Sequence, residues 1–334
     1  MYRERYTQGK LDYSTPADIM TAMIKTERNL DDYEKVIVSI SGGADSDIVL
    51  DMIERVGHEG QAEYVWFDTG MEYQATKDHL VFLEEKYGIK IKRLPAIVPA
   101  PLGCKTFGVP FISKEVSERI NNLQRHNFDW KDAPFEVLVE KYPRCKAALR
   151  WWCNEKGDKS GFNVKNIKWL KEFLMAHPPT FSVSPNCCNG AKKNVVKRYI
   201  KEEMKEHSVL EVTGLRRAEG GQRATTYSSC FSEKSEKREA HFRPIFYLTD
   251  AVKAEYEQLF DIKHSACYET YGLKRTGCAC CPFGSRWEEE LRAAEQHEPK
   301  LHKAAWGVFG DSYEYHRKFR DFKDCMNHKQ TSLF

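Results

Sequence analysis

The sequence predicts a doubly wound α/β fold with a mostly parallel, Rossmann-like sheet, and three features support this fold class. Short apolar segments rich in β-branched residues alternate with amphipathic segments of helical length between residues 15 and 96. This order gives parallel strands joined by right-handed crossovers. The 334 residues, 41% apolar and 30% charged, suit one large soluble domain or two modest ones.

The N-terminal elements follow a regular order of helix and strand. A first helix is expected over residues 15–30, where Ile19 and Met23 share one face. Continuous apolar runs then indicate strands that are buried on both faces of a sheet. We expect strands at 35–41, 62–70 and 89–96, with helices at 45–57 and 74–88 between them.

Beyond residue 96 the pattern is less regular. Prolines and the Trp151-Trp152 pair indicate an inserted loop and helix region, which we place at about 97–180. The predicted organisation is an N-terminal helical segment (1–30), an α/β domain (31–250) that carries the insert, and a C-terminal helical region (251–334). Later helices are expected at 166–179, 190–207, 249–260, 286–297 and 311–324, and extended segments at 209–214 and 241–248.

Composition limits the class of protein. The N-terminus is polar without an apolar signal core, and no run of about 18 apolar residues occurs, so we expect a cytoplasmic protein without a membrane span. The net charge of +3 does not by itself indicate nucleic-acid binding. Eleven cysteines is a high, odd number, and in a reduced compartment clustered cysteines indicate metal ligands or catalytic thiols. The alternative is that they are small buried apolar residues.

The sharpest local signal is the segment Ser39-Ile40-Ser41-Gly42-Gly43-Ala44-Asp45-Ser46. A buried strand runs into a Ser-Gly-Gly turn, and a helix starts at once. Glycines allow a tight turn and a close approach to a ligand, and the helix start offers amide N–H groups to a phosphate. The alternative is a turn that uses glycine for geometry alone. The segment lacks the Gly-Lys-(Ser/Thr) ending of a Walker loop.

This loop resembles the pyrophosphate-binding motif of the PP-loop ATP-pyrophosphatase, or adenine nucleotide α-hydrolase, superfamily. Within it, the chain is most similar to the phosphoadenylyl-sulfate (PAPS) reductase-like family. Asp68-Thr69-Gly70, the stretch from Gly214 to Glu219 with Arg223, and Arg243-Pro244-Ile245 before Leu248-Thr249-Asp250 match further family segments. Gly220-Gly221 replaces the usual Ser, and Leu248 the usual Trp. The similarity covers about residues 35–285.

The resemblance implies a nucleotide- or phosphate-binding site. Asp68 is a candidate catalytic residue that holds a metal, a ribose or a water, or else caps the next turn. Asp45 either caps the loop helix or faces Mg²⁺ bound with ATP. Arg216, Arg217 and Arg223 are expected to clamp phosphate or sulfate oxygens, or else to form a solvated basic surface. The complete predicted set is Ser39, Ser41, Gly42, Gly43, Asp45, Ser46, Thr69, Gly70, Gly214, Arg216, Arg217 and Arg223.

Four cysteines form a candidate metal site: Cys187, Cys188, Cys278 and Cys281. Two pairs supply four sulfur ligands, which suits a [4Fe-4S] cluster or zinc. An adjacent Cys-Cys pair followed by a distant C-x-x-C resembles the [4Fe-4S] motif of adenylyl-sulfate reductases and of DNA-phosphorothioation proteins, so we expect the cluster, completed by the C-terminal region. Cys280 is expected to be a non-ligand or an alternate ligand.

Cys325 is a candidate catalytic nucleophile. It follows Asp324 and precedes His328 by three residues, and reductases of the family carry their nucleophile in a C-terminal Glu-Cys-Gly-x-His tail. The histidine would help to ionise the thiol. Met326 replaces the glycine of that tail.

These features predict a sulfonucleotide reductase-like enzyme that binds adenylyl sulfate or PAPS beside a [4Fe-4S] cluster and uses a thiol reductant. One alternative is an ATP-pyrophosphatase that activates a nucleic acid or another acceptor for sulfur supplied by a cysteine desulfurase. There the insert at 97–160 would contact nucleic acid, or else it is a packed helical subdomain. Another alternative is a non-catalytic nucleotide-binding regulator. A homodimer would fit each of these functions.

Overall fold

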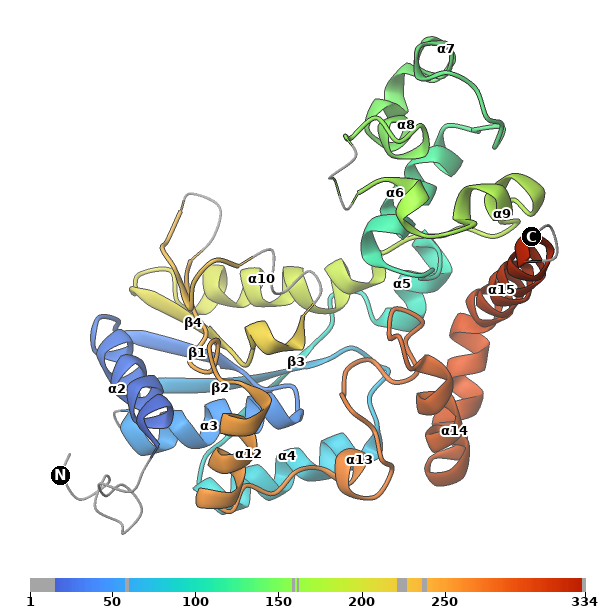
Figure 1. The fold of residues 1–334 in the computed structure, drawn as a ribbon. Helices are drawn as coiled ribbons and strands as arrows, with labels where there is room; N and C mark the ends of the chain where they lie inside the picture. The colour runs from blue at the N-terminus through green and yellow to red at the C-terminus, as the bar shows by residue number, and fades with distance from the viewer. Residues whose placement is uncertain are drawn as a thin grey trace. The chain divides into compact units, whose positions relative to one another are not determined.

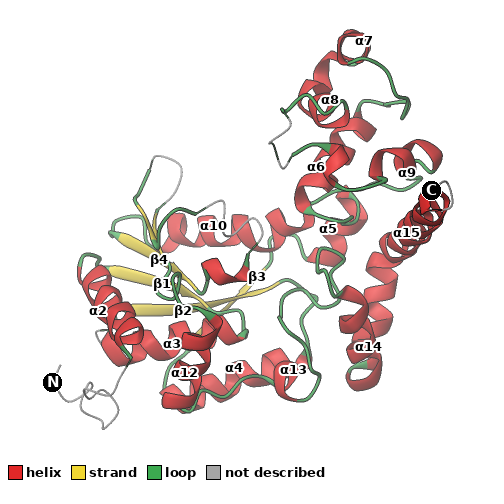
Figure 2. Ribbon diagram, in the orientation of Figure 1, coloured by secondary structure: helices red, strands yellow, loops and turns green. Residues whose placement is uncertain are grey.

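The computed structural model describes residues 16–57, 60–157, 160, 162–220, 227–235 and 239–331. The chain forms two compact units, each built from two separate segments (Figures 1 and 2). Unit 1 comprises the described residues of Met1–Ile97 and Lys192–Ala279, and unit 2 those of Val98–Ala191 and Cys280–Phe334. No described helix combines the length and the apolar character needed to cross a membrane.

Unit 1 contains a six-stranded sheet with the order β3-β2-β1-β4-β6-β5. All neighbouring pairs are parallel except β5 and β6, which are antiparallel. The predicted α/β class with a mostly parallel sheet is therefore confirmed. The strands are β1 (Lys35–Ser39), β2 (Ala62–Asp68), β3 (Ile91–Pro95), β4 (Val209–Thr213), β5 (Phe231–Ser232) and β6 (Ala240–Phe242).

Both faces of the sheet are covered, because side chains alternate across each strand. Val36 and Val38 of β1 belong to the core beneath one face, and Ile37 belongs to the core on the opposite face. In Figure 1, α10 covers the second face, and the first is covered by α2, α3, α4 and α12. The helices of unit 1 are α2 (Ala17–Asp31), α3 (Ala44–Val56), α4 (Gln74–Tyr87), α10 (Asn194–Glu203), α12 (Asp250–Leu259) and α13 (Ala266–Glu269).

Unit 2 is helical, and its core is rich in aromatic side chains. Phe111 and Phe173 pack against Tyr315 with ring centroids 4.8 and 4.9 Å away. Trp151 and Trp152 are buried in the same core, so they pack inside the unit rather than at its surface. The helices are α5 (Ala100–Phe107), α6 (Lys114–Arg125), α7 (Phe135–Lys141), α8 (Lys146–Trp152), α9 (Leu170–Ala176), α14 (Trp287–His297) and α15 (Pro299–Thr331).

Several elements differ from the sequence-based expectation. The extended segment expected at 241–248 stops at Phe242, and a turn follows, because Pro244 has no N–H for a ladder. The helix expected at 166–179 is interrupted at Trp169, whose φ of 68° leaves only α9 as a regular helix. A π-helical turn, Asn189–Lys193, precedes α10. The final helix runs much further than 311–324, over Pro299–Thr331.

Candidate functional site

The glycine loop joins β1 to α3 and is held closed by one hydroxyl. Ser46 Oγ accepts hydrogen bonds from the backbone N–H of Ser41 at 3.2 Å and of Gly43 at 3.1 Å, and donates to the Gly43 carbonyl at 2.7 Å. This arrangement is a capping box at the start of α3. Ser46 is only 4% exposed, so its hydroxyl shapes the loop from inside the protein.

Two glycines are required here by geometry. Gly42 has a φ of +68°, and a Cβ at this position would lie 2.6 Å from Thr76 Cγ2. A Cβ on Gly214, which follows β4, would lie 2.7 Å from the carbonyl oxygen of Asp45. The chain after β4 therefore approaches the first turn of α3 so closely that no side chain fits between them.

A pocket of about 160 Å³ lies over this loop, entirely within unit 1. The loop and the start of α3 form one side, and the segments after β4 and around α13 form the others. Because the first turn of a helix has unpaired N–H groups and a positive dipole end, this side of the pocket favours anions. The lining residues are Ser41, Gly43, Ala44, Asp45, Ser46, Gly214, Arg216, Glu219, Lys253, Tyr268, Lys274, Arg275 and Thr276.

Asp45 and Arg216 meet in an ion-pair network at the pocket wall. Asp45 Oδ1 lies 3.1 Å from Arg216 Nε and 3.1 Å from Lys253 Nζ. Arg216 also pairs with Asp250 at 2.7 Å, and the Arg216 guanidinium lowers the pKa of that carboxyl. Since Arg216 is only 6% exposed and engages two carboxylates, its guanidinium is built into the wall.

Besides Ala44 and Glu219, which lie within the matched motif segments, five lining residues were not predicted from the sequence: Lys253, Tyr268, Lys274, Arg275 and Thr276. Lys253 lies on α12, and Tyr268 lies on α13. The others lie in the irregular segment that follows α13. The only available signal was the position of Lys274 and Arg275 a few residues before Cys278, because no periodic pattern marks an irregular segment.

Asp68, Thr69 and Gly70 form a tight turn after β2. Asp68 Oδ1 accepts from the Gly70 N–H at 3.0 Å, so Asp68 caps this turn. Thr69 is fully buried, its hydroxyl donates to Glu72, and its Oγ1 lies 3.2 Å from Cys278 Sγ. Burial raises the pKa of Glu72, although hydrogen bonds from Thr69 and the charge of Lys192 oppose this. These residues do not line the pocket over the glycine loop.

The four predicted metal-ligating cysteines belong to both units. Cys278 lies in unit 1, whereas Cys187, Cys188 and Cys281 lie in unit 2. None of the four forms a disulfide with another described residue. Within the described ranges, no three or more His, Cys, Asp or Glu side chains are grouped as a metal site. Cys280 is fully buried and its thiol donates to the Glu290 carbonyl at 3.6 Å, so it already has a partner inside unit 2.

Among the described residues of the prediction, Ser39, Gly42 and Arg217 do not line the pocket over the glycine loop. Ser39 ends β1, and Arg217 is exposed beside Arg216. Arg223 lies outside the described residues. Cys325 is exposed within α15 of unit 2, and His328 lies three residues later in the same helix. The candidate nucleophile is therefore carried by a continuous helix.

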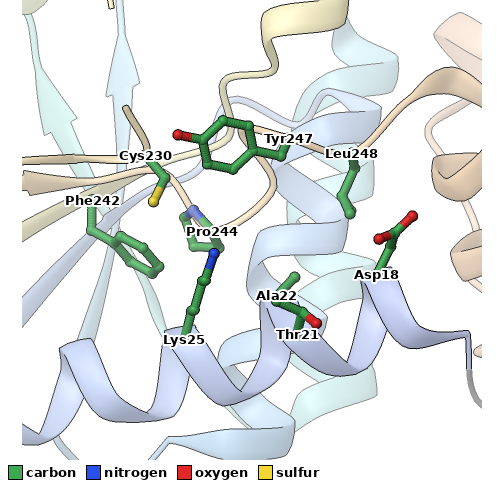
Figure 3. Close-up of a pocket in the computed structure, with 9 residues that line it drawn as sticks. All are labelled: Asp18, Thr21, Ala22, Lys25, Cys230, Phe242, Pro244, Tyr247 and Leu248. Carbon is green, nitrogen blue, oxygen red and sulfur yellow. The ribbon is translucent and has the colours of Figure 1, made fainter. Parts of the chain in front are cut away.

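A second pocket in unit 1, of about 210 Å³, lies along α2 (Figure 3). Its lining includes the apolar Phe242 and Leu248, and its charged groups are Lys25 and Asp18. Lys25 Nζ lies 5.7 Å from the centroid of the Tyr247 ring. With one cation balanced by one carboxylate, this pocket does not select an anion.

Residues 35–97 match the family model described as the phosphoadenosine phosphosulfate reductase domain. The phosphate complex of PAPS reductase from Candida auris has a similar structure, with 12% identity, a TM-score of 0.42, and coverage of 77% of this chain and 87% of that chain. The U34-tRNA thiolase NcsA from Methanococcus maripaludis with its [4Fe-4S] cluster also has a similar structure. It has 12% identity and a TM-score of 0.37, and the match covers 90% of this chain and 80% of that chain. No protein of curated function matches the sequence.

Proposed function

We propose, on the premise that residues 35–97 belong to the phosphoadenosine phosphosulfate reductase domain family, that this protein is an enzyme that binds an adenine nucleotide over its glycine loop. The resemblance to the PAPS reductase-like family that the sequence predicts is confirmed for residues 35–97 by this match. The substrate we propose is a sulfonucleotide, either adenylyl sulfate or PAPS.

The observation that carries this proposal is the charge and shape of the pocket over the loop. Lys253 lines it from α12, and Lys274 and Arg275 line it from the segment after α13. A phosphate or sulfate placed there would meet a helix N-terminus on one side and cations on the other. Arg216 and Lys253 both pair with carboxylates, but the Arg216 side chain is 8% exposed and that of Lys253 is 18% exposed. We therefore assign the more buried Arg216 to positioning the wall and Lys253 to the anion.

The proposed reaction is reduction of the sulfonucleotide by a thiolate. The Cys325 thiolate attacks the sulfur, a new S–S bond forms, and the bond between sulfur and the bridging phosphate oxygen breaks. AMP, or its 3′-phosphorylated form, leaves with that electron pair. A thiol reductant then attacks the Cys325 sulfur, sulfite leaves with the electron pair of the S–S bond, and a second thiol regenerates Cys325 as a disulfide forms. Exposure of Cys325 on α15 leaves it accessible to such a reductant.

We further propose a [4Fe-4S] cluster held by Cys187, Cys188, Cys278 and Cys281. The donor chemistry fits, because all four side chains are thiols outside any described disulfide, and a further thiol, Cys280, is engaged with Glu290. When bound, the cluster supplies a redox-active centre whose potential depends on its thiolates and their hydrogen bonds. The Thr69 hydroxyl lies 3.2 Å from Cys278 Sγ, but it already donates its one proton to Glu72 and so is not a donor to this thiolate. Zinc would use the same four ligands.

One observation favours the alternative of an ATP-pyrophosphatase. Asp45 lines the same pocket, and its carboxylate lies beside two cations, Arg216 and Lys253. A carboxylate beside phosphates is a typical ligand of the Mg²⁺ that accompanies ATP. In this function the enzyme would transfer AMP to an acceptor, pyrophosphate would leave, and a sulfur donor such as a desulfurase would displace AMP.

The test is calorimetric binding of adenylyl sulfate, PAPS and ATP with Mg²⁺, followed by assays of sulfite and pyrophosphate release. Sulfite release that disappears in Cys325→Ser, while Cys153→Ser keeps it, supports the reductase. Sulfite release that persists in Cys325→Ser excludes this mechanism. ATP-dependent pyrophosphate release without sulfite supports the alternative. Nucleotide binding with neither product identifies a regulator, and no binding at all contradicts the proposal.

A further inference from the structure

His264 lies between two carboxylates close to the proposed nucleotide pocket. Its Nδ1 lies 2.9 Å from Asp47 Oδ2, and its Nε2 lies 2.9 Å from Glu257 Oε1. Burial alone would lower the pKa of His264, but the hydrogen bonds and charges of Asp47 and Glu257 outweigh it and raise this pKa to about 9. At neutral pH the ring is therefore an imidazolium that donates both N–H groups.

Glu257 is shared between His264 and a lysine of the pocket. The same oxygen, Oε1, lies 3.4 Å from Lys253 Nζ. Lys253 Nζ lies 3.1 Å from Asp45 Oδ1, and both Lys253 and Asp45 line the pocket. Charges thus alternate along a continuous chain from buried Asp47 to the pocket wall, and all its members belong to unit 1.

This chain makes Lys253 sensitive to a group that does not line the pocket. While His264 is charged, it offsets much of the negative charge of Glu257, which then attracts Lys253 less strongly. Without that positive charge, Glu257 would hold the ammonium group more tightly and the pocket would become less positive. Because the site is partly shielded from water, these charges act with a reduced dielectric constant.

We propose that His264 is a positioning residue that keeps Lys253 available to the bound anion and thereby couples nucleotide affinity to a proton. The inference rests on the proposed function, because it concerns the same pocket. It extends that function by adding a regulated step, since a change of pH or a substitution outside the pocket would change the affinity for the nucleotide.

The surroundings of His264 predict the form of this pH dependence. It faces Asp47 of α3, Glu257 of α12 and the ring of Tyr268 of α13, whose centroid lies 5.7 Å away. Its backbone N–H donates to Glu269 at 3.2 Å, and His79 of α4 shares Asp47 Oδ2 at 3.0 Å. Burial raises the pKa of Tyr268 above its usual value near 10. We therefore expect affinity to be constant near pH 7.5 and to fall as pH rises through about 9.

The experiment measures ADP binding by calorimetry in the full-length protein at pH 7.5 and across pH 7–9.5. His264→Gln is expected to bind ADP about fivefold more weakly and to lose the fall in affinity near pH 9. Glu257→Gln is expected to change affinity in the opposite direction, because Lys253 loses a competing carboxylate. The double variant should return close to wild type. His79→Gln is the matched control, since it contacts Asp47 without touching Glu257.

The signs of these effects separate positioning from a purely structural role. Equal losses in His264→Gln and Glu257→Gln would indicate damage to the fold and overturn the inference. If the wild type binds ADP and His264→Gln binds it with the same affinity, the inference is overturned but the proposed function is left intact. A wild type that binds neither ADP nor inorganic pyrophosphate would overturn both. If His264→Gln does not fold, the pH profile of the wild type decides, and a flat profile up to pH 9.5 contradicts the inference.

Discussion

Gly42 is the residue on which the shape of the glycine loop depends most. Its backbone is left-handed, and a methyl group there would collide with Thr76 Cγ2 at 2.6 Å. The left-handed conformation alone costs a non-glycine residue about 1 kcal/mol. The steric overlap adds to this cost, because Thr76 is buried and has little space into which to move. Both penalties fall on the segment that forms one side of the pocket.

We therefore predict that Gly42→Ala lowers the free energy of unfolding by about 2–3 kcal/mol and weakens nucleotide binding. Urea denaturation and ADP calorimetry measure the two effects. Gly88→Ala is the matched control, because Gly88 has a similar φ of +64° and no atom within 4 Å of its added Cβ. It should cost about 1 kcal/mol and leave binding unchanged. Similar losses in both variants would show that the contact with Thr76 is unimportant.

Among the residues of the pocket, the sequence predicts some and misses others, and the reason is physical. Ser41, Gly43 and Asp45 were predicted because a strand, a glycine turn and a helix start are recognisable in order. Lys253 and Lys274 reach the pocket only through tertiary structure. The partners of Arg216 could not be inferred either, because Asp45 lies 171 residues away in the chain.

At the scale of elements, α12 is fixed to α3 by a buried carboxylate. Asp51 of α3 is 1% exposed, and its Oδ2 accepts from the hydroxyl of the fully buried Tyr256 at 2.7 Å and from Arg55 at 2.6 Å. Its Oδ1 accepts from Tyr87 of α4 at 2.9 Å. The Arg55 guanidinium also lies 4.0 Å from the centroid of Phe260, just after α12. This network joins three helices beneath the sheet.

Tyr256→Phe should therefore lower the free energy of unfolding by about 2 kcal/mol, because a buried carboxylate oxygen loses a strong donor. Tyr87→Phe is the matched control. It removes a hydroxyl from the other oxygen of the same carboxylate, but Tyr87 is partly exposed and water can replace the lost donor, so we expect a loss of about 1 kcal/mol or less. Chemical denaturation checks both, and a larger loss in Tyr87→Phe would contradict this account.

Helix α15 contributes a histidine that must stay neutral. Burial lowers the pKa of His316 to about 4, although the charge of Glu288 opposes the shift, and Nε2 accepts from the Ile112 N–H at 3.2 Å. Its unfolded pKa is near 6.5. Between these values the unfolded chain binds more protons than the folded one. The stability that neutral His316 provides is therefore complete above about pH 6.5 and lost as pH falls toward 4.

We predict that the wild-type protein loses about 2 kcal/mol of stability from this group between pH 6.5 and 4. His316→Gln keeps an acceptor for the Ile112 N–H but cannot titrate, so its stability should fall less over the same range. Thermal unfolding of both proteins across this pH range measures the difference. Identical pH profiles would show that His316 does not contribute to acid sensitivity.

The sequence predicts helices and strands well where a hydrophobic pattern continues over the whole element, and poorly where a local turn sets the end of the element. The strands β1, β2 and β3 and their helices lie close to the expected ranges, because both the apolar runs and their breaks are clear. The expected extension to residue 248 was wrong because Thr249 caps α12 and the preceding residues turn. The interruption at Trp169 rests on a positive φ that no residue pattern indicates.

At the scale of the whole molecule, each unit combines distant parts of the chain. Unit 1 joins an early segment to Lys192–Ala279, and unit 2 joins the intervening segment to the C-terminal residues. Chain order alone does not reveal this arrangement. Tertiary packing determines it, through the pairing of β1 with β4 in one unit and the packing of Tyr315 and Phe319 with Phe173 in the other.

The proposed cluster leads to a prediction for the intact protein. Anaerobic purification should yield about four iron and four sulfide per chain. Cys188→Ser and Cys281→Ser should lose most of this iron, whereas Cys280→Ser should retain it because Cys280 is buried with a partner of its own. Iron and acid-labile sulfide analysis, with zinc measured in parallel, checks the expectation. Stoichiometric zinc without sulfide, or no metal at all, would contradict it.

The position of β4 beside β1 also has a consequence for biosynthesis. Ser39 and Thr213 are paired neighbours in the sheet. While the ribosome adds the roughly 170 residues between them, at about 5–20 residues per second, one edge of β1 has no β-strand partner for roughly 9–35 s. An apolar strand with an open edge is prone to pair with other nascent chains. Heterologous expression at reduced translation temperature, or with holdase chaperones in excess, should therefore raise the soluble yield.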